Sequence, residues 1–225
     1  MSEILFVTPL FMLKCLNRFH PACPSLRHWN RPMPYTPEHR ARTKKKVIDV
    51  ARKQFNLNGF DGVSIDQIMT AAGLSRGGFY HHFKDKEELF AAAVDSFQNG
   101  LSDVADADDA LSGHALIQAF MNGYLNETQL VPEGGHCPMI AVPSDVSRRG
   151  AEVKQSYQRV VEAMLNLFQD NLDLPTQQRT REIALTLCMI SVGGMVLARA
   201  VDDSTFQNEL IDAARKAPAG LGLST

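Results

Sequence analysis

Apolar positions along most of the chain recur with the 3.6-residue period of amphipathic α-helices. The first convincing example ends at residue 58, before Gly59, and begins at residue 37 or residue 43. Lysines and arginines lie largely outside its apolar stripe, which consists of Val47, Ile48, Ala51 and Phe55. The pattern predicts a helix with one buried face and one basic face.

Residues 64–83 predict two short helices joined by a tight turn. Ser64 can cap the first helix, and Gln67, three residues later, completes a capping box. Gly73 can adopt the positive φ that ends a helix, and Ser75 offers a second N-cap. The spacing is that of a helix-turn-helix.

The second of these helices is expected over residues 76–83, with Phe79 and Phe83 four residues apart on its buried face. Its two adjacent glycines, Gly77 and Gly78, each cost about 1 kcal/mol relative to alanine inside a helix. A bare backbone that presses against DNA explains them, and a tightly packed neighbouring helix is the alternative.

The rest of the chain is predicted to be helical as well. We expect a helix from Lys86 to about residue 101, started by a second capping box of Asp85 and Glu88. Three prolines make residues 131–143 a loop or a broken helix. The further helices are expected over residues 110–129, 151–171, 176–201 and 205–216. The fold class is therefore all-α.

The segment between Glu182 and Arg199 contains sixteen consecutive uncharged residues. It is slightly short for a membrane span, so we expect a buried helix and no membrane contact. One face can meet its own domain and the other a second subunit, and Gly193 with Gly194 would allow close helix approach. The residues expected at the subunit interface are Leu185, Met189, Val192, Gly193 and Val196.

Residues 43–89 resemble the DNA-binding domain of the tetracycline-repressor (TetR) family of bacterial regulators. The resemblance covers about 47 residues and spans three helices. It is carried by the apolar core of the first helix, Gly59-Phe60, Ser64, Ala72-Gly73-Leu74-Ser75, Tyr80, His82-Phe83, Lys86 and Leu89.

The resemblance implies a three-helix helix-turn-helix domain over residues 36–85 and a larger helical ligand-binding and dimerisation domain over residues 86–217. It also implies that the helix starting at Lys86 transmits a shift to the DNA-reading heads, and that the last two helices form the dimer interface. The expected function is a dimeric, ligand-responsive transcriptional regulator, a repressor, which a small-molecule effector releases from a pseudo-palindromic operator.

The distribution of charge along the chain supports DNA binding by its amino-terminal part. The 225 residues carry a net charge of −2, which by itself says nothing about nucleic-acid binding. Residues 36–90 hold ten Lys or Arg and seven Asp or Glu, whereas residues 91–225 hold nine and seventeen. The basic half is therefore the half with the helix-turn-helix.

The DNA contacts are expected from two groups of residues. Arg76, Gly77 and His81, with Gly78 beside them, are assigned to base edges or close approach in the major groove. The second group is assigned to phosphates and consists of Lys44, Ser64, Tyr80, Lys84 and Lys86.

The effector is expected in an adaptable apolar lining with a few polar tips. The candidate residues are Phe120, Met121, Tyr124, Cys137, Tyr157, Met164, Cys188 and Met195, and plain core packing is the alternative for each. Cys137 could instead sense oxidants or electrophiles if its pKa is lowered. A ligand-independent DNA-binding protein is a further alternative.

Other chemistry finds little support. No nucleophile elbow, HExxH, Walker loop or dinucleotide fingerprint occurs, so we expect no enzyme and no cofactor. The four cysteines lack the spacing of a zinc site, and reduced thiols fit a cytoplasmic protein. Residues 1–35 are expected to be a disordered extension or the product of a start site placed too early, and residues 218–225 a flexible tail.

Overall fold

The computed structural model describes residues 36–98, 111–130 and 137–223, and these contain α-helices, short 3₁₀ helices and no β-strand. The all-α prediction is confirmed. The predicted extension over residues 1–35 lies outside the described residues.

The amino-terminal part consists of α1 (Pro37–Asn58), α2 (Ile65–Ala71), the 3₁₀ helix η2 (Arg76–His81) and α3 (Lys86–Asp95). Helix α1 begins at residue 37 because Thr36 caps it and Pro37 occupies its first turn. It ends at Gly59, whose φ is 70°. The aromatic residues Phe55, Phe60, Phe79, Phe83 and Phe90 fill the small core between these elements.

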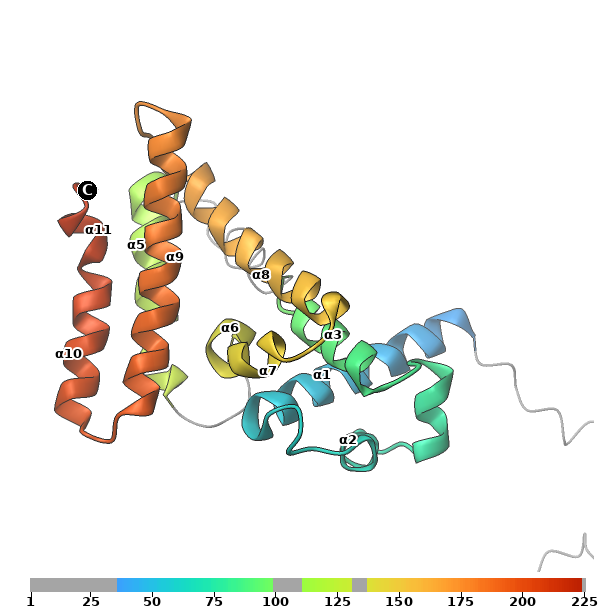
Figure 1. The fold of residues 1–225 in the computed structure, drawn as a ribbon. Helices are drawn as coiled ribbons and strands as arrows, with labels where there is room; N and C mark the ends of the chain where they lie inside the picture. Colours follow the sequence, from blue (N-terminus) through green and yellow to red (C-terminus); the bar gives the residue numbers. More distant parts are fainter. Residues whose placement is uncertain (1–35, 99–110, 131–136, 224–225) are drawn as a thin grey trace, which may run out of the picture.

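The described residues of the carboxy-terminal part form four main helices and four short ones. The main helices are α5 (Gly113–Tyr124), α8 (Ala151–Asp170), α9 (Gln177–Ala200) and α10 (Ser204–Arg215). The short ones are η3 (Glu127–Gln129), α6 (Pro138–Ala141), α7 (Pro143–Ser147) and α11 (Ala217–Gly220). In Figure 1, α5, α9 and α10 stand side by side at one end, and α8 runs from them towards α3 and α1.

The two parts share one continuous core. Helix α3 packs against α1 on one side and α8 on the other, and five of its ten residues are buried. Helices α6 and α7 lie beside the carboxy-terminal end of α1 (Figure 1). The predicted domain boundary at residue 85 therefore falls just before a helix that contacts both parts.

The structure corrects two predicted boundaries. Helix α3 ends at Asp95, and residues 99–101 of the longer helix that we predicted lie outside the described residues. Residues 218–223 are not a flexible tail: α11 continues the fold and Leu223 is buried, because this leucine packs into the main core. The glycines in this segment had suggested flexibility.

Helix α9 is the one described helix that is long and apolar enough to cross a membrane, with a mean hydropathy of 1.9 over its best window. It packs against both α8 and α10, and a core helix of a soluble protein meets the same criteria. One face of α9 therefore packs against its own chain, as the sequence predicts.

Candidate nucleic-acid interface

The turn between α2 and η2 is built as the sequence predicts. The Gln67 backbone N–H donates to Ser64 Oγ at 3.2 Å, and the Ser64 backbone N–H donates to Gln67 Oε1 at 2.7 Å. Gly73 adopts a φ of 68°. Ser75 has the extended backbone of an N-cap, but its side chain makes no capping hydrogen bond. The start of the next helix is therefore less firmly fixed than the start of α2.

The recognition element is a six-residue 3₁₀ helix, η2, and not the eight-residue α-helix predicted over residues 76–83. Two glycines in sequence lower the α-helical propensity of this segment, and without a side-chain cap it does not extend into a longer helix. Phe79 and Phe83 are buried as predicted and anchor the element to the core.

The two glycines of η2 are not required by packing inside this chain. A Cβ at Gly77 would meet no atom within 4 Å, and a Cβ at Gly78 would meet Met69 Cε at 3.7 Å, an ordinary contact. Neither glycine has a positive φ. The alternative of a tightly packed neighbouring helix therefore finds no support in the described residues.

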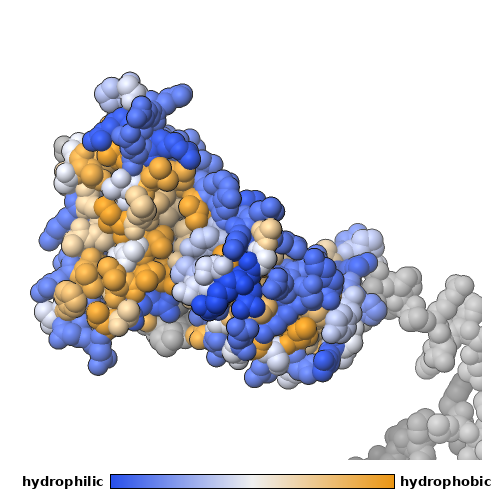
Figure 2. Space-filling view, in the orientation of Figure 1, coloured by the Kyte–Doolittle hydropathy of each residue, from blue (hydrophilic) through white to orange (hydrophobic). Residues whose placement is uncertain are grey.

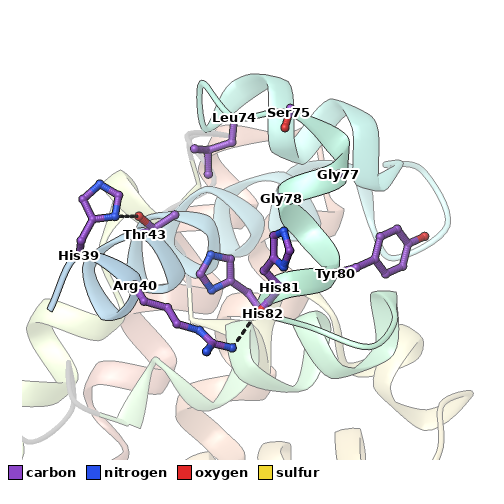
Figure 3. Close-up of a pocket in the computed structure, with 10 residues that line it drawn as sticks. All are labelled: His39, Arg40, Thr43, Leu74, Ser75, Gly77, Gly78, Tyr80, His81 and His82. Atoms are coloured by element: carbon purple, nitrogen blue, oxygen red, sulfur yellow. Dashed lines mark hydrogen bonds between the residues drawn. The ribbon is translucent and has the colours of Figure 1, made fainter. Parts of the chain in front are cut away.

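The glycine face borders a groove of about 830 Å³ between η2 and the first turns of α1 (Figure 3). Apart from Leu74, its lining consists of polar residues and glycines; the lining residues are His39, Arg40, Thr43, Leu74, Ser75, Gly77, Gly78, Tyr80, His81 and His82. Tyr80 is 59% exposed and points outward, away from α1. The groove thus lies beside η2, the second element of the helix-turn-helix.

Helix α1 holds η2 through a contact that the sequence did not suggest. Arg40 Nη2 donates to the backbone carbonyl oxygen of His81 at 2.7 Å, across 41 residues of sequence. Burial, followed by the charges of Arg40, His81 and Lys44, lowers the pKa of His82 below its usual range. His82 is therefore held neutral while Arg40 fixes the end of the recognition element.

The predicted phosphate-binding cations lie in two different surroundings. The ammonium group of Lys44 is 5.1 Å from the centre of the Phe83 ring, on the exposed face of α1 beside the groove. Lys84 forms an exposed ion pair of 3.1 Å with Glu152 of α8. Lys86 lies over the ring of Phe60 at 4.4 Å, half-buried, and burial lowers its pKa. Lys86 thus faces the carboxy-terminal part.

Arg76, which we assigned to base edges, pairs with Asp66 of α2 at 3.0 Å. Both side chains are more than half exposed. An exposed pair of this kind is worth about 0–1 kcal/mol, so a guanine edge or a phosphate could compete with it. Ser64 is engaged in the capping box, and its hydroxyl lies on the exposed surface.

The amino-terminal part matches a known family. Residues 47–93, which include α2, η2 and most of α3, match the sequence model described as bacterial regulatory proteins, tetR family. Curated regulators and solved structures of the same family agree with this match. Residues 47–93 are therefore part of a TetR-family DNA-binding domain.

Relatives of this chain include the transcriptional regulator LmrA of Bacillus subtilis. It is 21% identical over 168 residues, which cover 72% of this chain and 89% of LmrA. The transcriptional repressor Rv1474c of Mycobacterium tuberculosis is 38% identical over 55 residues, but these span only 29% of that protein. The match to the repressor AcnR of Corynebacterium efficiens spans 43% of AcnR.

Solved structures agree with the fold. A TetR-family regulator from Cytophaga hutchinsonii superposes with a TM-score of 0.68 at 19% identity, over 80% of this chain and 95% of the other. The reduced form of Escherichia coli NemR gives a TM-score of 0.66 at 15% identity, over 80% and 96% of the two chains. The helical fold of this chain is therefore shared with these two structures over 80% of its length.

Seven of the eight candidate effector residues are buried, and Tyr157 is half-buried. Four of them come together as a polar cluster: Tyr124, Cys137, Tyr157 and Cys188. Burial raises the pKa of Tyr124, and the neighbouring Cys137, Tyr157 and Cys188 add to the rise. The Tyr124 hydroxyl faces the Cys137 thiol, but it makes no bond of hydrogen-bonding geometry within the described residues.

The environment of Cys137 is the opposite of the one that a redox or electrophile sensor needs. The residue is 2% exposed, and burial raises the pKa of its thiol to about 12. A reactive cysteine has a lowered pKa and an accessible sulfur. The sensor alternative, which required a lowered pKa, is therefore not supported.

The predicted subunit-interface residues lie on an uncovered face of α9. Leu185, Met189 and Val196 are 37%, 66% and 36% exposed, and Val192 and Gly193 are half-buried. Figure 2 shows hydrophobic side chains gathered over α9 and α10, where Leu197 and Phe206 are also exposed. We call this surface, formed by these seven residues, the apolar face.

The two glycines of α9 differ in what they contact. A Cβ at Gly194 would lie 2.9 Å from Ala214 Cβ, so this glycine allows α10 to pack closely on α9. A Cβ at Gly193 would meet no atom within 4 Å. Close helix approach within the chain thus explains one glycine of the pair only.

Proposed function

We propose that this chain is a dimeric transcriptional repressor that binds a pseudo-palindromic operator and is released from it by a small molecule. The observation that supports DNA binding best is the glycine face of η2, which is bare, unstrained and open. Residues 36–85, which we call the head, would insert η2 into the major groove.

Within the head, we assign Arg76, Gly77, Gly78 and His81 to the base edges. Lys44, Ser64, Tyr80 and Lys84 are assigned to phosphates, since all four side chains lie on the exposed surface. Lys86 is the weakest of the predicted contacts because its ammonium group rests on Phe60. Its partial burial favours a role between the two parts of the chain.

The apolar face supports the dimer. Exposed apolar residues gathered on one helix face usually mark an interface in a soluble protein. A second copy that packs its own α9 and α10 here would bury this face and set two heads side by side. Two heads double the number of base pairs read, and their spacing selects operators with half-sites one helical turn apart, about 34 Å.

The polar cluster supports the effector site. Tyr124, Cys137, Tyr157 and Cys188 are polar groups in an otherwise apolar interior, and all four have raised pKa values. They are therefore uncharged at neutral pH, which favours an uncharged effector that accepts a hydrogen bond from the Tyr124 hydroxyl. A ligand that binds the released state more tightly shifts the population away from DNA. The site of action would be the cytoplasm, where operator DNA lies.

Selection from random-sequence DNA tests the first part of the proposal. The purified protein should enrich an inverted repeat, and the enriched fragment should bind with a strong dependence on salt concentration. Enrichment of a repeat whose two halves are each recognised would support the dimer. Binding with a salt dependence but without sequence preference would instead indicate an architectural DNA-binding protein.

Two further measurements test the dimer and the effector. Met189→Glu should convert the protein to monomers in sedimentation, because a charge on the apolar face cannot be buried without a partner. Leu57→Glu, on an exposed position of the head, should leave the dimer intact.

The effector is tested by a thermal-shift screen of uncharged aromatic compounds. Compounds that stabilise the protein should also release the selected DNA. A stabilising compound that never changes DNA affinity would favour the ligand-independent alternative.

A further inference from the structure

The turn over residues 59–61, between α1 and α2, contacts Asp145 in α7 and Arg149, which lies two residues after the end of α7. The Phe60 backbone N–H donates to Asp145 Oδ2 at 3.0 Å, across 85 residues of sequence. The Arg149 guanidinium carbon lies 4.2 Å from the centre of the Phe60 ring. Arg149 Nη2 also pairs with Asp61 Oδ2 at 3.2 Å. We call these three interactions the turn contact.

The turn contact is closely fitted. Gly59 has a positive φ of 70°, and a Cβ at this position would lie 2.9 Å from Asp145 Oδ2. The side chains of Asp145 and Arg149 are only 14% and 18% exposed. Water screens polar groups with this degree of burial only weakly, so the contacts of Phe60 with them depend strongly on geometry. Asp61 is 72% exposed, so water screens its pair with Arg149 more strongly. A displacement of α7 would act on all three interactions, because Asp145 lies in α7 and Arg149 two residues after its end.

The described residues form two other ion pairs between the head or α3 and the carboxy-terminal part, and both partners in each are more exposed than Asp145 and Arg149. Lys84 and Glu152 are 63% and 57% exposed, and Arg159 and Asp95 are 47% and 39% exposed. Exposed ion pairs of this kind contribute little and adapt to movement. The turn contact is therefore the link best suited to fix the orientation of the head.

The position of α7 connects the turn contact with the polar cluster. Cys137 precedes α6 directly, and α7 begins two residues after the end of α6. The Tyr157 hydroxyl donates to the backbone carbonyl oxygen of Met139, in α6, at 3.5 Å. One short segment, residues 137–149, thus carries a member of the cluster at one end and both partners of the turn at the other.

We propose that Asp145 and Arg149 are positioning residues that hold the head through residues 59–61, and that displacement of α6 and α7 releases this hold. The second half of the proposal rests on the proposed function, because it makes the polar cluster the place where an effector would act. Release through the turn is separate from the shift of the connecting helix, α3.

Hydrogen exchange measured by mass spectrometry tests the hold without an effector. Asp145→Ala removes the acceptor of the Phe60 N–H, whereas Asp145→Asn keeps an oxygen that can accept the same bond. Arg149→Ala removes the cation, and Lys154→Ala removes a cation from an exposed site on α8 as the matched control. All four variants keep the full chain.

We expect peptides that contain residues 59–63 to exchange at least tenfold faster in Asp145→Ala and Arg149→Ala. Asp145→Asn should recover most of the protection, and Lys154→Ala should not differ from the unmodified protein. Peptides from α9 and α10 report whether the fold is intact and should be unchanged. Equal exchange at residues 59–63 in all variants would overturn the proposal.

The affinity for the selected DNA fragment gives the functional readout. If the hold positions the heads, Asp145→Ala and Arg149→Ala should change this affinity at least fivefold relative to Lys154→Ala, and Asp145→Asn should restore it. An unmodified protein that selects no DNA would contradict the proposed function while the exchange experiment still tests the hold. Faster exchange with unchanged DNA affinity would show a merely structural contact and would overturn the positioning role.

Discussion

Replacing Gly77 by valine separates folding from DNA binding. A Cβ at this position meets no atom within 4 Å, the residue is exposed, and its φ is not positive. The Cβ of a valine therefore creates neither a clash nor backbone strain in the free protein. Because glycine is the more flexible residue in the unfolded chain, we expect a free energy of unfolding within about 1 kcal/mol of the original.

The same change should weaken DNA binding strongly. Valine adds three carbon atoms to the face of η2 that, in the proposed function, approaches the floor of the DNA major groove. Arg76 and His81 lie on the same six-residue element, so any withdrawal of η2 affects their contacts together. If each head loses one contact worth about 1 kcal/mol, a dimer loses about 2 kcal/mol, which corresponds to about 30-fold in Kd.

Gly123 provides the matched control for this experiment. It is exposed on α5, and a Cβ there also meets no atom within 4 Å. Gly123→Val should therefore keep both the fold and the affinity for the selected DNA, measured by fluorescence anisotropy beside thermal unfolding. If Gly77→Val retains affinity within about twofold of this control, η2 does not approach DNA through its glycine face.

Four other outcomes can be checked separately. Cys137 should resist alkylation by iodoacetamide at neutral pH until the protein unfolds, because burial raises its pKa to about 12; peptide mass spectrometry would detect early labelling. Lys44→Gln should reduce the slope of log K against log salt by about 1 per head if this lysine binds a phosphate. In the monomeric Met189→Glu background, Gly194→Val should lower the melting temperature at a cost of about 1–3 kcal/mol, since its Cβ meets Ala214, whereas Gly193→Ala should not, because its Cβ meets no atom of its own chain. Because the pKa of His82 is lowered in the folded protein, protonation favours the unfolded state, so stability should fall as the pH drops below about 6.5, and His82→Gln should weaken this dependence in urea titrations.

The features that local chemistry decides were predictable from the sequence. The capping box of Ser64 and Gln67 and the positive φ of Gly73 depend on residues within one helical turn, and both are present. The residues of α9 that we assigned to a second subunit are exposed or half-buried in the chain, and their spacing of three or four residues places them on one side of the helix. In each case the deciding interaction lies close in sequence or repeats regularly.

The features that depend on distant residues were not predictable in this way. The contact of Arg40 with the His81 carbonyl oxygen spans 41 residues, and that of Phe60 with Asp145 spans 85. Neither pair has a sequence spacing that sets it apart from other arginines and aspartates on helix surfaces. The burial of Leu223 was missed for the same reason, since its partners come from elsewhere in the fold.

Two pairs of adjacent glycines show how structure separates identical sequence signals. Both Gly77-Gly78 and Gly193-Gly194 lower helix propensity, and packing against a neighbour was a possible reason for each. Only Gly194 has a neighbour within the chain that a Cβ would meet closely. The other three lie where a side chain would fit without a clash, on the two surfaces that we assign to DNA and to a second subunit. Because no close contact within the described chain explains these three glycines, we infer that their partners lie outside the chain. Charge and hydrophobic patterning independently indicate the same two surfaces as binding surfaces for DNA and for a second subunit.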